Sequence, residues 1–280
     1  MKTRIITAIV AICVLVPVLF LSNTWVLPIA AAFCCALAVF EMLRCCELHA
    51  KYILSVPLIV VGAIAPLSVR LFETFGALLT YAMPVLIVLV FYFLALMVFS
   101  KGKVTIEDIS IGGFASFYIV FAFVALLALR YYEAMGAYVY LLIFIGAWIT
   151  DIFAYFCGML FGKHKLIPEV SPKKTVEGSV GGILFCGLSF IIYGLVLQNG
   201  LGVIADLNFL QLFFYGVVAS IVSQIGDLSM SAIKRRYEIK DFGKIFPGHG
   251  GMLDRFDSIL AVSSVLFVLN EISCVFTAIS

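Results

Sequence analysis

The sequence predicts an all-α, polytopic integral membrane protein. Hydrophobic residues make up 64% of the 280 positions and charged residues only 12%, whereas soluble domains carry about 25% charged residues. The mean hydropathy is +1.19. The apolar residues gather in runs of about 20, the length that a helix needs to cross a bilayer, and the alternating segments of about ten residues that are typical of membrane β-barrels are absent. We therefore expect a helical protein embedded in a membrane.

Nine apolar runs are expected to form transmembrane helices. The runs cover residues 4–22, 25–43, 52–69, 77–99, 111–129, 136–160, 179–198, 209–233 and 257–278. The first run follows Lys2 and Arg4 and has the length of a signal peptide. However, no small-residue cleavage site follows it and a second run begins almost at once, so we interpret it as a membrane helix.

Basic residues alternate between successive connectors. All lysines and arginines except Arg70 and Arg130 lie at the N-terminus or in the second, fourth, sixth and eighth connectors. Because cytoplasmic connectors carry an excess of Lys and Arg, we expect the N-terminus and the even-numbered connectors to be cytoplasmic. The net charge of +2 does not indicate a nucleic-acid partner. The eight cysteines form no CxxC pair and lie mostly in apolar runs, so neither zinc nor disulfides are expected.

The two halves of the chain are expected to differ in role. Residues 1–135 contain short connectors with ordinary flanking charges, and we expect these helices to provide packing, dimer or lipid surface. Residues 136–280 contain two longer cytoplasmic loops, 162–178 and 235–256, which are rich in Gly, Pro, Lys and Asp. We therefore expect the catalytic region in the second half.

Asp151 and Asp227 are acidic residues inside expected membrane helices. An ionisable side chain in a membrane helix costs about 2.5–3.5 kcal/mol on insertion scales, so such residues suggest function. Asp151 shares a helix face with Trp148 and Tyr155. Asp227 belongs to a polar stripe in which the serines fit equally well as hydrogen-bonding links between helices. The stripe comprises Ser220, Ser223, Gln224, Asp227, Ser231 and Lys234.

Asp254 and Asp257 lie three residues apart at the start of the ninth run, so they share a helix face. Acidic residues also stabilise helix N-termini, so one of the two fits a simple capping role. If the eighth and ninth helices are antiparallel neighbours, Asp227 and Asp254 meet near the inner membrane face. Such a pair suits Mg²⁺, which binds one or two carboxylates together with water and substrate phosphates. We therefore predict Asp227 and Asp254 as metal ligands.

A glycine-rich turn, Gly248-His249-Gly250-Gly251, lies between these carboxylates. Glycines permit positive φ and close approach of backbone N–H groups to a ligand, although a re-entrant bend would use them as well. His249 fits a loop hydrogen bond as well as a catalytic role. The basic residues Lys234, Arg235, Lys240 and Lys244 suggest a phosphate cradle around the turn. Lys173 and Lys174 fit either a second phosphate-binding element or an ordinary topology signal.

The segment from Gln224 to Ser258 resembles the signature region of the phosphatidate cytidylyltransferases, also called CDP-diacylglycerol synthases. The matching residues are Gly226-Asp227-Leu228, Ser231, Lys234-Arg235, Lys240-Asp241-Phe242-Gly243, Pro247-Gly248-His249-Gly250-Gly251, Leu253-Asp254-Arg255 and Asp257-Ser258. The similarity also covers Trp148, Asp151, Ala154-Tyr155, Gly158, Gly162-Lys163, Ser171-Pro172-Lys173-Lys174-Thr175 and Glu177-Gly178. Met230 and Tyr237-Glu238-Ile239 depart from the pattern, and the first 140 residues match only as hydrophobic helices.

The resemblance implies a membrane enzyme, expected as a homodimer, that converts CTP and phosphatidate to CDP-diacylglycerol and diphosphate in phospholipid biosynthesis. It also implies Mg²⁺, with K⁺ as a candidate second ion, and metal binding by Asp227 and Asp254. We expect Lys234 and Arg235 to act with them in catalysis, at the cytoplasmic face of the cell membrane. The expected substrate-binding residues are Lys173, Lys174, Ser231, Lys240, Asp241, Gly248, His249, Gly250, Gly251, Arg255, Asp257, Asp151 and Tyr155.

Two other classes of protein fit parts of the pattern. The first is a related CTP-using enzyme, either a polyprenol or phytol kinase or a cytidylyltransferase that acts on an archaeal lipid. The second is a transporter in which Asp151 and Asp227 relay protons or cations across the membrane. The long Gly-, Lys- and Asp-rich loop favours a phosphorylated substrate over transport.

Overall fold

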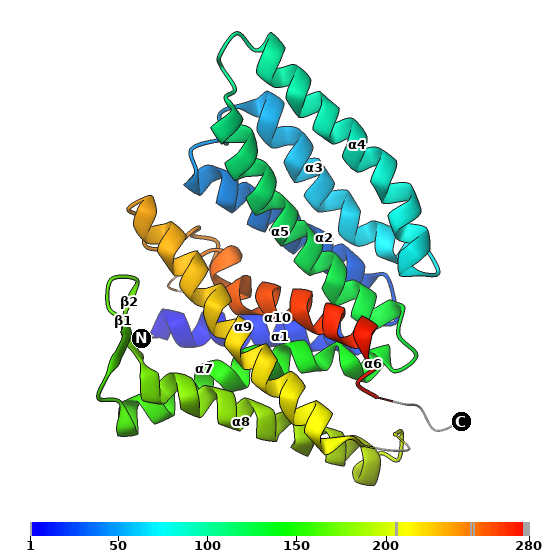
Figure 1. Ribbon diagram of the computed structural model, residues 1–280, viewed down its shortest axis with the longest axis vertical. Helices are drawn as coiled ribbons and strands as arrows, with labels where there is room; N and C mark the ends of the chain where they lie inside the picture. The colour runs from blue at the N-terminus through cyan, green and yellow to red at the C-terminus, as the bar shows by residue number, and fades with distance from the viewer. Residues whose placement is uncertain (1, 205–206, 247, 249, 277–280) are drawn as a thin grey trace. The chain divides into compact units, whose positions relative to one another are not determined.

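The computed structural model describes residues 2–204, 207–246, 248 and 250–276, with side chains from Val10 onward. Each of the nine predicted runs coincides with a helix in these residues (Figure 1). The α-helices are α1 (Lys2–Phe20), α2 (Val26–Cys45), α3 (Tyr52–Ser68), α4 (Phe75–Phe99), α5 (Ile106–Tyr131), α6 (Gly136–Val139), α7 (Leu141–Phe161), α8 (Val176–Leu195), α9 (Phe209–Arg236) and α10 (Leu253–Ile272). A 3₁₀ turn, η1 (Val69–Leu71), follows α3, and a π-helical turn, η2 (Val196–Gly200), follows α8. The polytopic all-α prediction is confirmed.

Seven of the described helical segments are long and apolar enough to cross a membrane. They are Val26–Cys45, Tyr52–Leu71, Phe75–Phe99, Ile106–Tyr131, Gly136–Phe161, Val176–Gly200 and Phe209–Arg236. In α10 the acidic and basic residues of the first turns, Asp254, Arg255 and Asp257, reduce the apolar stretch. The expected cytoplasmic position of the N-terminus stays a prediction.

The chain forms two compact units. The first contains Met1–Tyr132 and Tyr237–Arg255, and the second contains Glu133–Arg236 and Phe256–Ser280, as far as these are described. Residues 237–255, the centre of the predicted signature loop, therefore pack with the N-terminal helices. The predicted division of roles at residue 135 stays a prediction.

In the first unit, α2, α3 and α5 pack against one another, with α4 alongside (Figure 1). The core contains Cys35, Leu43, Leu54 and Ile119, all fully buried. A capping box formed by Thr105 and Asp108 begins α5, five residues before the predicted start. In contrast, only 6% of the most apolar window of α4 is buried, as expected for a helix that faces lipid.

In the second unit, α7 and α8 run side by side and α9 packs against both (Figure 1). Small residues allow this close approach, as is common between membrane helices. A Cβ added at Gly178 of α8 would overlap the carbonyl oxygen of Ala154 in α7. A Cβ at Gly146 of α7 would lie 3.2 Å from both Ala219 of α9 and Val262 of α10. At these glycines the backbone of one helix therefore lies directly against its neighbour, and a larger residue would force the helices apart.

The sixth connector is more ordered than a loop. It contains an antiparallel hairpin of β1 (Lys165–Ile167) and β2 (Ser171–Thr175). Thr175 ends β2 and caps α8, because its hydroxyl accepts a hydrogen bond from the N–H of Gly178 at 3.2 Å. The Lys173-Lys174 pair is therefore held on a strand that leads directly into a membrane helix.

Candidate active site

An ion pair joins the two-lysine segment of the sixth connector to the polar stripe of the eighth predicted helix. The ammonium group of Lys174, on β2, pairs with the Oδ2 atom of Asp227, on α9. The two side chains are 23% and 26% exposed, so they are half-buried but within reach of solvent. Lys174 of the sixth connector therefore pairs with Asp227 of the eighth predicted helix. This contact favours a role in a functional site over a role as an ordinary topology signal.

A second carboxylate lies beside this ion pair. Asp257, on α10, interacts electrostatically with the carboxylates of Asp227 and Asp151 and with the ammonium group of Lys234. The approach of α9 and α10 depends on a glycine, because a Cβ at Gly226 would lie 2.9 Å from the carbonyl oxygen of Asp257 and 2.7 Å from the Cβ of Ala261. The second unit thus gathers three acidic side chains and two lysines from four elements.

The polar stripe of α9 divides into two parts. Ser220, Ser223 and Gln224 are buried, and the Nε2 atom of Gln224 donates hydrogen bonds to the carbonyl oxygen of Ser179 at 3.3 Å and to the Ser220 hydroxyl at 3.4 Å. Gln224 therefore links α9 to α8, whereas its bond with Ser220 stays within α9 and the buried Ser223 hydroxyl has no hydrogen-bond partner among the described residues. Asp227 and Lys234, one and three turns further on, belong to the charged cluster.

The signature loop, residues 237–255, is organised around Asp254. This carboxylate is 8% exposed, and its Oδ2 atom accepts hydrogen bonds from the backbone N–H groups of Phe242 at 2.8 Å and Gly251 at 2.9 Å. Gly250 must be a glycine, since its φ is +86° and an added Cβ would lie 2.7 Å from the same oxygen. Gly248 also has a positive φ, of +81°. His249 lies outside the described residues.

Two further residues of this loop environment, Glu41 and Arg44 on α2, were not predicted as site residues. Glu41 is 1% exposed and accepts hydrogen bonds from the N–H groups of Met252 and Leu253. Arg44 donates a hydrogen bond to the carbonyl oxygen of Phe242. An acidic residue in an apolar run was the available signal, although Glu41 lies only two positions from the predicted end of its run.

Most of the remaining predicted residues lie at exposed or half-buried positions in the two units. Exposed residues of the second unit are Asp151, Tyr155, Lys173 and Arg235, with Ser231 half-buried. Exposed residues of the first unit are Lys240, Asp241 and Arg255, whereas Gly251 is buried. Asp227 and Asp254 belong to different units, so their predicted convergence stays a prediction.

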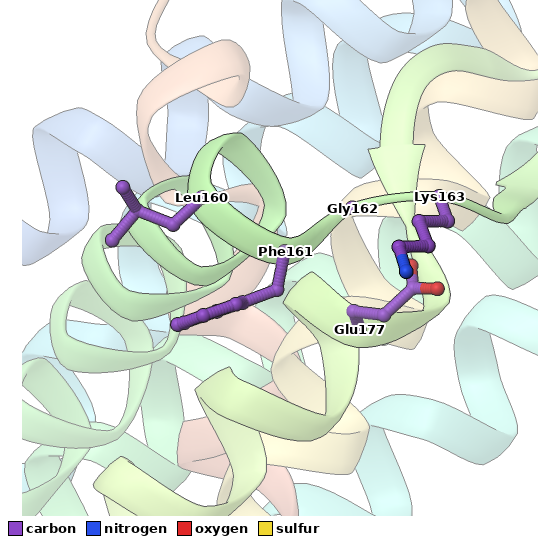
Figure 2. A pocket seen from close by; sticks show the side chains of 5 residues that line it. All are labelled: Leu160, Phe161, Gly162, Lys163 and Glu177. Atoms are coloured by element: carbon purple, nitrogen blue, oxygen red, sulfur yellow. The ribbon is translucent and has the colours of Figure 1, made fainter.

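The hairpin end of α7 carries a hollow of about 510 Å³ (Figure 2). Its lining consists of Leu160, Phe161, Gly162, Lys163 and Glu177, and the side chains of Lys163 and Glu177 point toward one another. Glu177 also interacts with the Nδ1 atom of His164 at 2.7 Å. None of the five lining residues is a predicted site residue, and the contact of Glu177 with His164 joins the start of the hairpin segment to α8.

A smaller hollow of about 190 Å³ lies between β1, α8 and α9. Its lining is almost entirely apolar and includes Ile167, Ile183, Ile221, Ile225 and Leu228. Gln224 also lines this hollow and lies one helical turn before Asp227 on the same face of α9. An apolar hollow therefore opens beside the charged cluster of the second unit.

The donor set of the second unit suits a divalent cation. Asp227 and Asp257 supply hard carboxylate oxygens, which Mg²⁺ prefers. No group of three His, Cys, Asp or Glu side chains in the described part of the chain is arranged to hold a metal ion. A cation at this cluster would thus take up to two of these carboxylates and complete its shell with water and substrate oxygens, which is usual for Mg²⁺.

Together, the fold and the cluster define a polytopic helical membrane protein that gathers carboxylates and lysines beside an apolar hollow. The sequence profile of the cytidylyltransferase family matches residues 2–273. The chain belongs to this family, whose members are nucleotidyltransferase enzymes.

The relatives of the chain are similar over nearly their full length. The phosphatidate cytidylyltransferase of Staphylococcus haemolyticus is 34% identical over 270 residues, which is 96% of this chain and 98% of that protein. The phosphatidate cytidylyltransferase of Staphylococcus epidermidis is 36% identical over 273 residues, with 96% and 98% covered. That of Bacillus subtilis is 34% identical over 276 residues, with 96% and 97% covered. The N-terminal helices are therefore part of the similarity.

Proposed function

We propose that this protein transfers the cytidylyl group of CTP to phosphatidate, giving CDP-diacylglycerol and diphosphate. The observation that carries this proposal is the cluster of Lys174, Asp227, Lys234 and Asp257, drawn from β2, α9 and α10. A mixed set of carboxylates and lysines at a membrane helix suits a cation and phosphates together. Full-length relatives that bear the name phosphatidate cytidylyltransferase support the same reaction.

In this reaction a phosphate oxygen of phosphatidate attacks the α-phosphorus of CTP. A new P–O bond forms there, the bond between the α-phosphorus and the bridging oxygen to the β-phosphate breaks, and diphosphate leaves with that oxygen and its electron pair. The attacking phosphate is already ionised at neutral pH, so the protein need not supply a strong base. Catalysis then rests on positioning and on neutralising phosphate charge, as in other phosphoryl transfers.

Lysines and arginines of both units are proposed to bind phosphate oxygens. Lys174 and Lys234 already lie among the carboxylates of the second unit. We assign phosphate binding also to Lys173, Arg235, Lys240 and Arg255, and hydrogen bonding to Ser231 and Asp241. The turn at Gly248, His249 and Gly250 is proposed to supply backbone N–H donors to the CTP phosphates, whereas the N–H of Gly251 is engaged by Asp254 and would orient the turn.

Mg²⁺ is the proposed cofactor, and a monovalent ion such as K⁺ is a candidate second ion. Mg²⁺ bound at such a site would polarise phosphoryl oxygens and offset the developing negative charge. We propose Asp227 as one ligand. For the second, Asp257 is favoured by its interaction with Asp227, whereas Oδ2 of Asp254 is engaged by two backbone N–H groups. Asp254 remains the ligand that the sequence pattern predicts, and substitution of each residue separates the two assignments.

The lipid substrate must reach the cluster from the bilayer. We propose that the apolar hollow beside Ile183, Ile221 and Ile225 receives the part of an acyl chain nearest the glycerol. Its volume of about 190 Å³ is below the roughly 300–1,000 Å³ of pockets that enclose whole ligands, so the rest of the chain would stay in lipid. Asp151 and Tyr155, both exposed on α7, are proposed to line the route of the lipid phosphate.

The active site is proposed to face the cytoplasm, because the basic connectors predict that orientation. A homodimer is proposed as the assembly. The exposed apolar surface of α4 is available to either lipid or a second copy, and cross-linking in native membranes decides between them.

The test is an assay of the purified protein with CTP, phosphatidate and Mg²⁺ in detergent, with the lipid product identified by mass. The proposal predicts CDP-diacylglycerol, and label from the α-phosphate of CTP in the lipid. Label from the γ-phosphate in the lipid would instead identify a kinase. Because detergent abolishes any gradient, the absence of CTP-dependent diphosphate release would favour the transporter alternative.

A further inference from the structure

An acidic residue of the N-terminal half contacts the signature loop directly. Glu41 lies in α2, a helix whose other residues are apolar except for Arg44 in the last turn, and only 1% of its surface is exposed. Ionisable residues inside membrane helices are rare and usually have a functional partner. For Glu41 this partner is more than 200 residues further along the chain.

Both carboxylate oxygens of Glu41 accept backbone hydrogen bonds. Oε1 accepts the N–H of Met252 at 3.1 Å, and Oε2 accepts the N–H of Leu253 at 2.8 Å. Leu253 is the first residue of α10, and the first N–H groups of a helix have no partner within the helix. Glu41 therefore caps α10 from a different helix, where its negative charge is also favourable for the helix dipole.

Glu41 and Asp254 accept hydrogen bonds from different backbone N–H groups of this turn. Asp254 accepts the N–H groups of Phe242 and Gly251, and Glu41 accepts the next two N–H groups along the chain. Two buried carboxylates thus fix four backbone donors of one loop. Hydrogen bonds to charged groups are the strong ones, so both ends of this turn are held firmly.

The glycines of the signature loop fit around Glu41. A Cβ added at Gly243 or at Gly251 would overlap the Glu41 carboxylate. These two positions must therefore lack a side chain for the carboxylate to reach the backbone. Glycines that the sequence suggests for ligand binding are thus also required for the contact between the loop and Glu41 of α2.

A neighbour of Glu41 contacts the loop nearer its start. Arg44, three residues further along α2, donates a hydrogen bond to the carbonyl oxygen of Phe242. The end of α2 therefore contacts the loop at Phe242 as well as at Met252 and Leu253.

We propose that Glu41 is a positioning residue of the cytidylyltransferase reaction, which sets the conformation of the signature loop for binding CTP. This rests on the proposed function, in which the loop binds the CTP phosphates. It also assigns a role to the N-terminal helices, whose sequence carries no part of the signature.

The test compares Glu41→Gln with Glu47→Gln, a matched control at an exposed glutamate just after α2. The Glu41→Gln substitution keeps the size of the side chain but presents an NH₂ group to a backbone donor. We expect the KM for CTP to rise about tenfold or more, since a charged acceptor is replaced at two hydrogen bonds, with the KM for phosphatidate within about twofold. Hydrogen exchange of the Met252 and Leu253 amides should accelerate by a similar factor, and Glu47→Gln should resemble wild type.

An unchanged KM for CTP together with unchanged amide exchange in folded Glu41→Gln would overturn the proposal. If Glu41→Gln does not insert, Arg44→Gln replaces it, because Arg44 is exposed and its loss buries no charge. A KM for CTP that stays unchanged in Arg44→Gln would then assign this contact to folding alone and also overturn the proposal. If wild type forms no CDP-diacylglycerol, the proposed function fails, whereas the exchange measurement still reports whether Glu41 holds the loop.

Discussion

Asp227→Asn should separate catalysis from stability. The carboxylate of Asp227 pairs with Lys174, and both side chains are about a quarter exposed. Surface ion pairs contribute roughly 0–1 kcal/mol to stability, because water screens them and the side chains lose entropy. Because this pair is half-buried, the loss of one partner should cost more than that, but less than the roughly 3–5 kcal/mol of a fully buried pair. The variant should therefore insert and stay folded, with a lower melting temperature.

The effect on turnover should be far larger. With substrates bound and water displaced, a carboxylate about 4 Å from a cation contributes up to about 4 kcal/mol at an effective dielectric constant of about 20. Since 1.36 kcal/mol corresponds to a factor of ten in rate, Asp227→Asn should lower kcat about a thousandfold. The assay follows CDP-diacylglycerol formed from CTP and phosphatidate by purified protein.

The matched control is Asp108→Asn. Asp108 forms an ion pair with Lys51 in the first unit and also caps α5, so its loss should cost at least as much stability. Turnover of this control should stay within about threefold of wild type, because Asp108 belongs to neither the charged cluster nor the signature loop. Turnover of Asp227→Asn within tenfold of the control would refute the reasoning, as would a loss that follows unfolding in both variants.

Further substitutions test other parts of the site. Asp257→Asn should lower turnover with little change in stability, and raised Mg²⁺ should partly restore its turnover. Asp254→Asn should instead mainly destabilise the loop, because two backbone N–H groups lose a charged acceptor worth about 1.5–3 kcal/mol each. Thermal melts and Mg²⁺ titrations of turnover distinguish the two variants. Gly226→Val should destabilise the protein by about 1–3 kcal/mol, as measured by thermal melting, because its side chain would overlap α10. Ile225→Trp should fill the apolar hollow and raise the KM for phosphatidate without changing the KM for CTP; equal changes in both constants would contradict the assignment of the hollow to lipid.

Membrane helices could be predicted from sequence because each depends on its own apolar length. The boundaries were less accurate where polar residues belong to a helix. The fifth run was predicted to begin at residue 111, but α5 begins at Ile106, since Thr105 and Asp108 form a capping box and Glu107 lies in the first turn. Hydropathy alone counts these residues as connector, although their hydrogen bonds begin the helix.

Contacts between distant segments could not be predicted in the same way. The sequence indicated Lys174 and Asp227 separately, and only the packing of α7, α8 and α9 shows that they pair. Glu41 was missed because its partners are backbone N–H groups, which carry no residue-specific signal. For Asp254, the sequence also suggested helix capping, but the N–H groups that its carboxylate accepts, those of Phe242 and Gly251, precede α10.

Binding of Mn²⁺, followed by electron paramagnetic resonance as a probe for Mg²⁺, tests the central claim most directly. In the presence of CTP, we expect wild type and Asp108→Asn to bind the ion with the same affinity. Asp227→Asn and Asp257→Asn should each weaken binding by about tenfold or more, because each removes a carboxylate from a site that offers up to two. Unchanged Mn²⁺ affinity in both variants would contradict the assignment of the cation to this cluster.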